Sequence, residues 1–374
     1  MAIPVNIIHV GLGLIGGTTI AILREQRSRW ERDFGVSLKF RSFVDSSGGV
    51  ACDEAGGYAD QTIDRILAAR ATGIKVHDAA PGIGLTPRSA SDALDIALSM
   101  GPAIVIDCAT GVGAAALTAR AIAQGGGAVF SNKAPLALPL DKPNSVAIWN
   151  QTGRGGLVRY ETSCGAGLPV ISTLRSLLDS GDQVISISGA LSGTLGAIFA
   201  DVSSGSLFSQ AVHSAKQNGY TEPDPREDLS GLDVARKALI LARTIGMSID
   251  LDAITVESLV PAGLLNVPVP EFMERISISD NAMAGRAAQA TAGGDSLKYV
   301  ASVDPENGVS IGVQPVSKET VLGSLQGPEN VITIRTERYD EFPVTVAGPG
   351  AGAAVTAAGV VADVLALSNV LKEH

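Results

Sequence analysis

The sequence predicts an α/β protein with two domains, and three observations lead to this prediction. The chain has 374 residues, enough for two domains of ordinary size, and its 45% of hydrophobic residues can bury a large core. Short apolar runs alternate with helical patterns over residues 5–152, which is typical of a parallel sheet with helical connections. Residues 298–336 read instead as antiparallel strands, so the second domain is predicted to be of the α+β class.

The first predicted strand, at 5–10, is followed at once by Gly11, Gly13 and Gly16 and then by a helix at 18–29. Gly-x-Gly-x-x-Gly between a strand and a helix is the fingerprint of a Rossmann-type dinucleotide-binding domain. The glycines allow a tight turn, close approach of a pyrophosphate and close packing of helix on strand, while the helix N-terminus faces the phosphates. The candidate cofactor contacts in this loop are Gly11, Gly13, Leu14, Ile15 and Gly16.

The second predicted strand, at 38–44, ends at Asp45. An acid at this place commonly binds the ribose hydroxyls and disfavours a 2′-phosphate, so we expect NAD to be accepted at least as well as NADP. The spacing from the glycines exceeds the usual ~20 residues, and Ser46, Ser47 and Arg41 offer an alternative as phosphate ligands.

The remaining elements of the first domain follow from the same patterns. We expect strands at 103–107 and 128–130, a loop at 74–90, and helices at 59–72, 91–99, 113–124 and 143–152. Thr110 and the pair Asn132-Lys133 follow the carboxyl ends of the two strands, where ligands of open α/β sheets sit. Lys133 is therefore either a solvated charge or a group directed into the cleft.

In the second domain we expect a strand at 157–162, a glycine turn at 164–168, helices at 169–180, 192–199 and 206–218, and strands at 183–190, 298–303, 308–315 and 331–336. Residues 257–260, 271–275 and 280–289 look helical in part. Gly350 lies in a glycine turn before a helix at 355–371, a place for a negative group or a cofactor edge.

Residues 219–237 carry the acidic side chains Glu222, Asp228 and Asp233 together with Lys237. Prolines predict an extended loop at 221–227, and Ser230 with Asp233 resembles a capping box that starts a helix. Asp233 and Lys237 are then i, i+4 neighbours, which alone would be read as an ordinary exposed ion pair. Acids on both loop and helix can instead form a pocket for a ligand with an ammonium group and a group that exchanges a proton.

This stretch, GYTEPDPREDLSGLDVARK, closely resembles the signature of the homoserine dehydrogenase family. Further segments agree in the same order, namely HVGLGLIGG, SNKAPLA, YETSCGAGLPVI, SGALSGTLGAIF and GPGAGAAVTAAGVVADVL. The resemblance implies a Rossmann domain from 1–156, completed by 341–374, and a catalytic and dimerisation domain over 157–340. It also implies reversible NAD(P)H-dependent reduction of L-aspartate 4-semialdehyde to L-homoserine.

We expect Lys237 to be the proton donor, because lysine is ordinarily protonated at neutral pH. Glu222 and Asp233 are expected to hold the substrate ammonium or to orient Lys237, with Asp228 as a further acid and Tyr220 as a backbone contact.

Other roles are implied by the resemblance alone. It makes Thr110 a cofactor contact and Thr194 a substrate contact, and it brings Lys133 close to nicotinamide and substrate. It also implies a sodium site whose ligands are Glu161 and the carbonyls of Cys164, Ala166 and Leu168. A homodimer without a C-terminal regulatory domain is expected.

Two alternatives remain open. Gly196-Ala197 departs from the larger pair common in the family, so a same-fold oxidoreductase acting on another amino-acid aldehyde is the first. The second is a nonenzymatic nucleotide-binding regulator.

The net charge of −10 argues against nucleic acid and anionic membranes as partners. Three dispersed cysteines suit a reducing compartment. The start of the chain lacks a basic targeting segment, and we expect no apolar run to approach the ~20 residues of a membrane span. We therefore expect a soluble, cytoplasmic protein with a small-molecule substrate.

Overall fold

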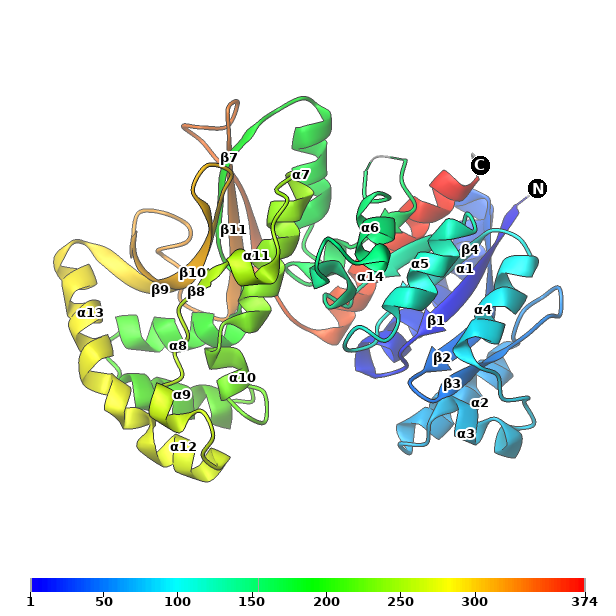
Figure 1. The fold of residues 1–374 in the computed structure, drawn as a ribbon, viewed down its shortest axis with the longest axis horizontal. Helices are drawn as coiled ribbons and strands as arrows, with labels where there is room; N and C mark the ends of the chain where they lie inside the picture. The colour runs from blue at the N-terminus through cyan, green and yellow to red at the C-terminus, as the bar shows by residue number, and fades with distance from the viewer. Residues whose placement is uncertain (1, 154, 373–374) are drawn as a thin grey trace. The chain divides into compact units, whose positions relative to one another are not determined.

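The protein is seen in a computed structural model that describes residues 2–153 and 155–372; Arg154, in the turn predicted to end the first domain, lies outside them. The chain divides into two compact units (Figure 1). Unit 1 comprises Met1–Gly167 with Gly352–His374, and unit 2 comprises Leu168–Ala351. Each unit has its own mixed sheet with helices, which confirms the predicted α/β fold class.

The sheet of unit 1 has the strand order β3-β2-β1-β4-β5-β6. Its strands are β1 Ile3–Val10, β2 Val36–Asp45, β3 Gly48–Ala51, β4 Ala103–Asp107, β5 Gly127–Phe130 and β6 Val158–Arg159. All neighbours pair in parallel except β2 and β3, which form an antiparallel hairpin that the sequence analysis missed. The parallel order reverses between β1 and β4, and this switch point is where such sheets bind ligands.

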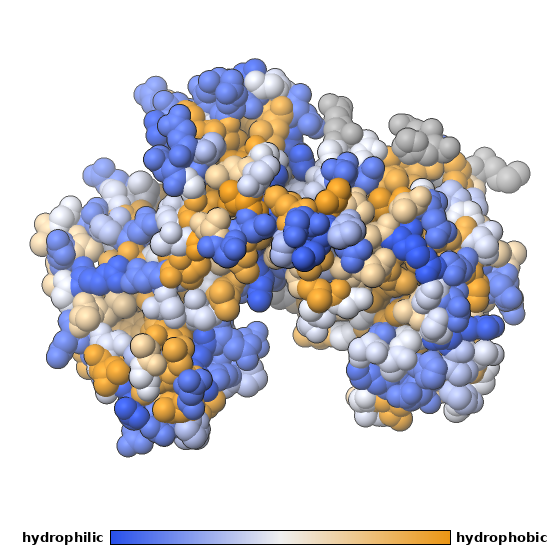
Figure 2. Space-filling model, in the orientation of Figure 1, coloured by the Kyte–Doolittle hydropathy of each residue, from blue (hydrophilic) through white to orange (hydrophobic). Residues whose placement is uncertain are grey.

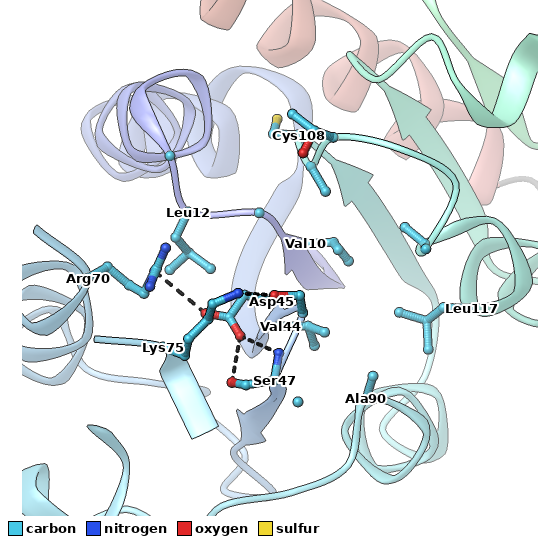
Figure 3. Close-up of a pocket in the computed structure, with 18 of the residues that line it drawn as sticks. Val10, Leu12, Val44, Asp45, Ser47, Arg70, Lys75, Ala90, Cys108 and Leu117 are labelled. Atoms are coloured by element: carbon cyan, nitrogen blue, oxygen red, sulfur yellow. Dashed lines mark hydrogen bonds and ion pairs between the residues drawn. The ribbon is translucent and has the colours of Figure 1, made fainter. Parts of the chain in front are cut away.

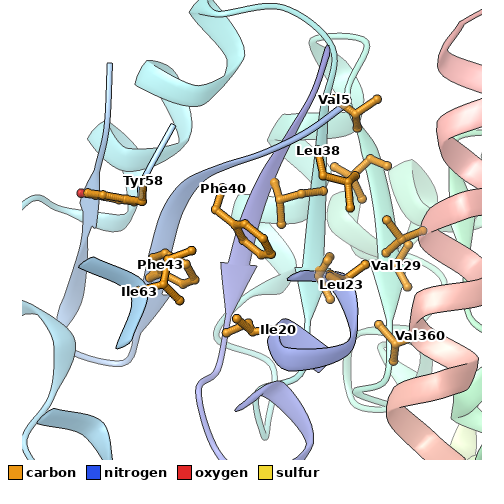
Figure 4. Packing of buried hydrophobic residues seen from close by; sticks show 14 of the residues in the cluster. Val5, Ile20, Leu23, Leu38, Phe40, Phe43, Tyr58, Ile63, Val129 and Val360 are labelled. Atoms are coloured by element: carbon orange, nitrogen blue, oxygen red, sulfur yellow. The ribbon is translucent and has the colours of Figure 1, made fainter. Parts of the chain in front are cut away.

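Helices cover both faces of this sheet. They are α1 Leu14–Phe34, α2 Asp60–Ala71, α3 Val76–Ala79, α4 Ala90–Ser99, α5 Ala115–Ala123, α6 Pro143–Trp149 and α14 Ala353–Leu371. Val5 and Ile7 of β1 pack with Leu23 of α1 and Val360 of α14, as Figure 4 shows in part. Ile8 points to the opposite face, into a second cluster with α4 and α5, because side chains alternate along a strand.

The C-terminal helix α14 is 19 residues long and apolar enough to cross a membrane by length and composition. The prediction that no apolar run approaches this length is therefore wrong. In unit 1, however, α14 packs on α1, β4 and β5, and 56% of its most apolar window is buried. This burial is typical of a core helix.

The sheet of unit 2 has the order β12-β11-β7-β9-β10-β8 and is antiparallel except for the β10–β8 pair. Its strands are β7 Val184–Ala190, β8 Thr255–Val256, β9 Asp295–Asp304, β10 Gly308–Ser317, β11 Glu329–Thr336 and β12 Val344–Pro349. Its helices are α7 Val170–Asp179, α8 Gly193–Ser203, α9 Phe208–Gln217, α10 Arg226–Leu229, α11 Leu232–Thr244, α12 Val269–Arg275 and α13 Asp280–Ala292. Phe199 of α8 stacks on Tyr299 of β9 with ring centroids 6.2 Å apart, so aromatic contacts join helix and sheet.

Three parts of the sequence prediction need correction. Of the strand predicted at 157–162, only β6 is present, and it pairs with β5 in the sheet of unit 1. A short 3-10 helix at Glu161–Ser163 follows it. β12 pairs with β11 and so belongs to unit 2, which moves the limits between the units from the predicted 156 and 340 to 167 and 351. Residues 257–260 are not helical, because the Glu257 amide extends the pairing of β8 with β10.

On the face seen in Figure 2, hydrophilic and hydrophobic residues are interspersed over the surfaces of both units. Scattered exposed apolar residues are normal for a globular protein. Two stand out by their position: Leu14, 77% exposed in the first turn of α1, and Phe342, 78% exposed in the loop between β11 and β12.

Candidate active site

The glycine-rich loop after β1 is shaped by close backbone contacts. Gly11 has φ of 84°, and a Cβ there would lie 2.6 Å from the Ala109 nitrogen. A Cβ on Gly16 would lie 2.0 Å from the Gly11 oxygen, so neither position accepts a side chain. No atom of the described residues lies within 4 Å of a Cβ built on Gly13, which caps α1. The loop therefore offers an open backbone surface beside a helix N-terminus, and it fits a pyrophosphate.

A pocket of about 680 Å³ opens beside this loop, and we call it the glycine-loop pocket (Figure 3). Its walls come from the glycine loop, the carboxyl ends of β2 and β4, and the first turns of α4 and α5. Of the predicted cofactor contacts, Gly11, Gly13, Asp45 and Thr110 line it. Leu14, Ile15, Gly16, Asn132 and Lys133 belong to unit 1 but do not line this pocket.

The Asp45 carboxylate is engaged by its own chain. Oδ1 accepts hydrogen bonds from the Ser47 amide at 2.9 Å and the Ser47 hydroxyl at 2.8 Å. Oδ2 accepts from the Val76 amide at 2.9 Å and lies 3.5 Å from Arg70 Nε. Burial opposes ionisation of Asp45, but these hydrogen bonds and the Arg70 charge outweigh it and hold its pKa below the usual value.

Asp107, at the end of β4, was missed by the sequence analysis and organises the neighbouring turn. Its side chain is fully buried and accepts hydrogen bonds from the Ala109 amide at 3.0 Å and from Asn132 Nδ2 at 3.1 Å. Burial raises its pKa to about 6, although these hydrogen bonds act the other way. Asn132 also donates to the Gly111 oxygen at 2.7 Å, so it braces the turn that carries Thr110.

Three other residues considered for the cofactor lie elsewhere. Arg41 is buried and donates to Asn6 and to the carbonyls of Glu54 and Ala55, so it is not in the pocket. Gly350 lies in unit 2, where a Cβ would overlap the Asn330 side chain. Lys133 lies in unit 1 and is half-buried; Ser131 and Asn132 separate it from the end of β5.

In unit 2, six predicted residues gather into what we call the carboxylate–lysine cluster; its members are Thr194, Tyr220, Glu222, Asp228, Asp233 and Lys237. Lys237 sits in α11 with its side chain 11% exposed. Its ammonium donates to the Leu191 carbonyl at 2.6 Å and lies 2.9 Å from Asp233 Oδ2. The predicted Asp233–Lys237 ion pair is thus present, but its lysine is buried. The Leu191 carbonyl, between β7 and α8, accepts a hydrogen bond from the buried ammonium.

Asp228 connects the loop to α8. Its Oδ2 accepts from the Glu222 amide at 2.8 Å, and its Oδ1 lies 2.9 Å from the Thr194 hydroxyl, which also lies 2.6 Å from the Tyr220 oxygen. A hydroxyl carries one proton, so both Thr194 contacts are satisfied together only when Asp228 is protonated. Burial, and to a smaller extent the Asp233 charge, raises the Asp228 pKa, although the hydrogen bonds from the Glu222 amide and the Thr194 hydroxyl act the other way. The Glu222 side chain is exposed.

The helix start differs from the predicted capping box. Residues 226–229 form the short helix α10 instead of an extended loop, and Gly231, with φ of 74°, is the N-cap of α11. Ser230 donates its hydroxyl to the Glu227 oxygen instead of receiving the Asp233 amide. A Cβ on Gly231 would lie 2.1 Å from the Tyr299 hydroxyl, so the sheet fixes this junction through a contact distant in sequence.

Arg226 anchors the loop and was also missed. Its guanidinium pairs with Asp224 at 2.7 Å and donates to the carbonyls of Leu264, Leu265 and Val267. The arginine therefore ties the proline-rich loop to the segment before α12.

The unusual pair Gly196-Ala197 has two separate explanations. A Cβ on Gly196 would lie 2.9 Å from the Gly327 oxygen, so glycine permits close packing of α8 on that segment. Ala197 instead lines a cavity of about 240 Å³ together with Tyr220 and Pro328.

The predicted cation ligands divide between the units. Glu161, Cys164 and Ala166 belong to unit 1, whereas Leu168 belongs to unit 2, where its carbonyl accepts the Val170 amide at 2.8 Å. Ala166 has φ of 53°, the sole positive value at a non-glycine residue in the described chain. The Glu161 amide donates to buried Asp363, whose pKa burial raises to about 7. Among residues 2–153 and 155–372, no three His, Cys, Asp or Glu side chains group as metal ligands.

Comparison with known proteins gives a consistent result. A family model described as homoserine dehydrogenase matches residues 169–365. The homoserine dehydrogenase of Saccharomyces cerevisiae is 38% identical over 275 residues, which cover 72% of this chain and 76% of that protein. A bifunctional aspartokinase/homoserine dehydrogenase of Arabidopsis thaliana is 35% identical over 365 residues, covering 96% of this chain. The chain spans 38% of the length of that relative.

Solved structures agree with the fold. A protein of unknown function from Candida auris is 31% identical, with a TM-score of 0.82 over 98% of each chain. A hyperthermophilic archaeal homoserine dehydrogenase mutant in complex with NADPH is 25% identical, with a TM-score of 0.71 over 97% of each chain.

Proposed function

Since the chain belongs to the homoserine dehydrogenase family, we propose that it reduces L-aspartate 4-semialdehyde reversibly to L-homoserine with NAD(P)H. The observation that carries this proposal is the buried Lys237 ammonium, held by the Leu191 carbonyl and Asp233 within the carboxylate–lysine cluster. A dehydrogenase of this kind needs a positioned acid that can also act as a base.

The glycine-loop pocket would hold the dinucleotide, with its pyrophosphate at Gly11, Gly13 and the start of α1. A bound nicotinamide would supply or accept the hydride. The Lys237 ammonium would give a proton to the aldehyde oxygen as it becomes an alkoxide, and would take a proton from the homoserine hydroxyl in reverse. Asp233 and the Leu191 carbonyl would keep that ammonium in place.

The acids of the cluster would receive the substrate ammonium. Asp228 in α10 and the exposed Glu222 in the preceding loop would bind it, and arrival of a cation would favour ionisation of Asp228. Thr194 and the Tyr220 carbonyl would keep the loop against α8 while the substrate binds. Lys133 would position the substrate or polarise its carbonyl.

The direct test is homoserine-dependent reduction of NAD(P) by the purified chain, followed by absorbance of the reduced nicotinamide. We expect reduction that requires both homoserine and dinucleotide. No reduction with homoserine, by a chain that still binds dinucleotide, would contradict the proposal.

A second substrate class follows from Ala197, because a small side chain in the 240 Å³ cavity beside Tyr220 leaves room for a longer substrate. The test compares kcat/KM for homoserine and for its homologue with one more methylene. A higher value for the longer substrate would favour this alternative.

We propose a homodimer that forms through the sheet of unit 2. Within residues 2–153 and 155–372, β12 is an edge strand that pairs with β11 alone, and Tyr339 and Phe342 are exposed in the loop between these strands. Light scattering at micromolar concentration should give twice the chain mass; a monomeric mass would remove the proposal.

A sodium ion held by Glu161 and the carbonyls of Cys164, Ala166 and Leu168 is likewise proposed, on the family resemblance. Sodium should raise the unfolding temperature more than potassium at equal ionic strength, and Glu161→Gln should abolish the difference. An equal effect of the two ions on the unmodified chain would contradict it. Cytoplasmic location stays a prediction.

A further inference from the structure

A second cavity of unit 2 carries positive charge without an acid in its lining. It has a volume of about 320 Å³ and is lined by the end of α8, the start of β9 and the segment 318–326 between β10 and β11. We propose that this cavity, which we call the dilysine pocket, binds the phosphoryl group of a small metabolite through Lys298 and Lys318. The site goes beyond the proposed function, which assigns neither homoserine nor dinucleotide to it.

The first step concerns the place of Lys298. It lies in β9 opposite Gln314 of β10 and shares a face of the sheet with Val300, because side chains alternate along a strand. Val300 packs with Leu322 and Leu325, so the segment after β10 covers the face that carries the lysine. Lys298 is only 3% exposed. The fold therefore holds a cation where water reaches little of its side chain.

The second step concerns the partners of this cation. A lysine ammonium has three N–H donors. Within residues 2–153 and 155–372, the Lys298 ammonium makes one hydrogen bond, to the Leu325 carbonyl. Burial lowers the pKa of Lys298, and no carboxylate of the described residues acts against this shift. A buried charge is stabilised when it is paired and hydrogen-bonded. An anion in the pocket would supply both.

The third step concerns net charge. Two lysines and no aspartate or glutamate are among the described residues that line the pocket. In the same parts of the chain, no carboxylate lies within 4.0 Å of the ammonium of Lys298 or of the exposed Lys318. Asp201 lines the neighbouring 240 Å³ cavity, and Glu319 is exposed, so neither compensates the pair. Two uncompensated charges favour a dianionic phosphoryl group over a carboxylate with one charge.

The fourth step concerns the neutral groups of the lining. The exposed Gln326 side chain has no hydrogen-bond partner in the described chain, so its amide can donate to an anion. The four serine hydroxyls of the lining donate to carbonyls of the chain, as Ser203 does to the Leu297 oxygen at 3.1 Å. The Ala200 carbonyl at the end of α8 accepts the Ser204 amide at 3.0 Å. The donors left for a ligand are therefore the two lysines and the glutamine.

The test titrates inorganic phosphate calorimetrically into the full chain saturated with NADPH, which keeps phosphate out of the glycine-loop pocket. We expect one phosphate per chain, bound more tightly than acetate. Lys298→Met should weaken phosphate binding about 10- to 100-fold, the range for losing one charged hydrogen bond. Lys318→Met should give a smaller loss, because its charge is exposed. Lys142→Met removes an exposed lysine of unit 1 that pairs with Asp141, and as the control it should change nothing.

A second measurement separates ligand binding from folding. Because Lys298→Met removes a buried charge that the chain does not pair, this variant should unfold in phosphate-free buffer at no lower temperature than the unmodified chain. A lower unfolding temperature would overturn the proposal, since it would show that the chain itself compensates the lysine.

Three results of the titration would also overturn it: no binding of phosphate, acetate bound as tightly as phosphate, or unchanged phosphate affinity in Lys298→Met. The proposed function is tested separately, because homoserine-dependent reduction of NAD(P) is assayed without phosphate.

Discussion

The glycine-loop pocket of unit 1 and the carboxylate–lysine cluster of unit 2 are built by different means. The pocket depends on where side chains are absent: Gly11 and Gly16 leave no space for a Cβ, and Gly13 faces open space. The cluster depends on the side chains of Thr194 in α8, Asp228 in α10 and Lys237 in α11, which bond to one another, to backbone groups or to Asp233.

Because of this difference, dinucleotide binding and proton transfer depend on different groups of the protein. Backbone amides at a helix start recognise phosphate whatever the surrounding side chains are, so single substitutions in unit 2 should leave nucleotide binding intact. Proton transfer depends on one ammonium at one place, so loss of Lys237 has no substitute. The predictions below follow this division, from the largest expected effect to the smallest.

Lys237→Ala should lower kcat about 10²–10⁴-fold, the usual contribution of a positioned acid or base. Lys237→Arg should not rescue homoserine oxidation, because a guanidinium does not release its proton to act as a base. Steady-state kinetics with homoserine test both variants. Near-normal turnover of either variant would show that Lys237 is only the ion-pair partner of Asp233.

Gly231→Ala should lower the free energy of unfolding by about 2–5 kcal/mol, since it adds strain at positive φ and a clash with Tyr299. Gly219→Ala is the matched control: its φ of 72° is similar, but no other described residue, apart from its two chain neighbours, has an atom within 4 Å of the added Cβ. The control should cost about 1 kcal/mol. Urea unfolding measures both, and equal losses would mean that the Tyr299 contact is unimportant.

In both regions, local sequence patterns predicted most of the features that depend on residues close together in the sequence. The glycine fingerprint placed the loop and the start of α1, and i, i+4 spacing placed Asp233 beside Lys237. The identities of the acids came from the family signature. Each of these features depends on residues within a few turns of one another.

Features that depend on distant contacts were not predictable in this way. The Leu191 carbonyl that receives Lys237 is 46 residues away, and Asn132 is 25 residues from Asp107. The sequence predicts Ser230 as the helix cap, but Gly231 is the N-cap of α11 in the structure. The close approach of Tyr299 leaves no space for a Cβ at Gly231. Asp45 reads as a ribose ligand, but it is engaged by Arg70 in the last turn of α2 and by the Val76 amide at the start of α3.

Asp107 gives a pH-dependent prediction in unit 1. Its pKa of about 6 in the fold lies above the usual 3.8, so between these values the folded state keeps a proton that the unfolded state loses. Its contribution to stability therefore falls as pH rises from about 4 to about 6. Relative to Asp107→Asn, the unmodified chain should lose about 2–3 kcal/mol over this range. Urea unfolding at both pH values measures this, and a pH-independent difference would contradict it.

Thr194→Val should raise KM for homoserine about 10-fold, because the valine cannot bond to the Tyr220 carbonyl and Asp228. The matched control is Thr173→Val, whose hydroxyl donates to the carbonyl of Pro169, the N-cap of its own helix. Steady-state kinetics should show KM unchanged in the control. An unchanged KM in Thr194→Val would mean that the loop does not need this anchor.

The separation of binding from chemistry is tested most directly by the dissociation constant of NADPH for Lys237→Ala and Lys133→Ala, measured by nicotinamide fluorescence. Lys237→Ala should bind NADPH as tightly as the unmodified chain, whereas Lys133→Ala, altered at the end of a strand of unit 1, should bind it more weakly. Weakening of NADPH binding in Lys237→Ala by as much as its turnover falls would contradict the account.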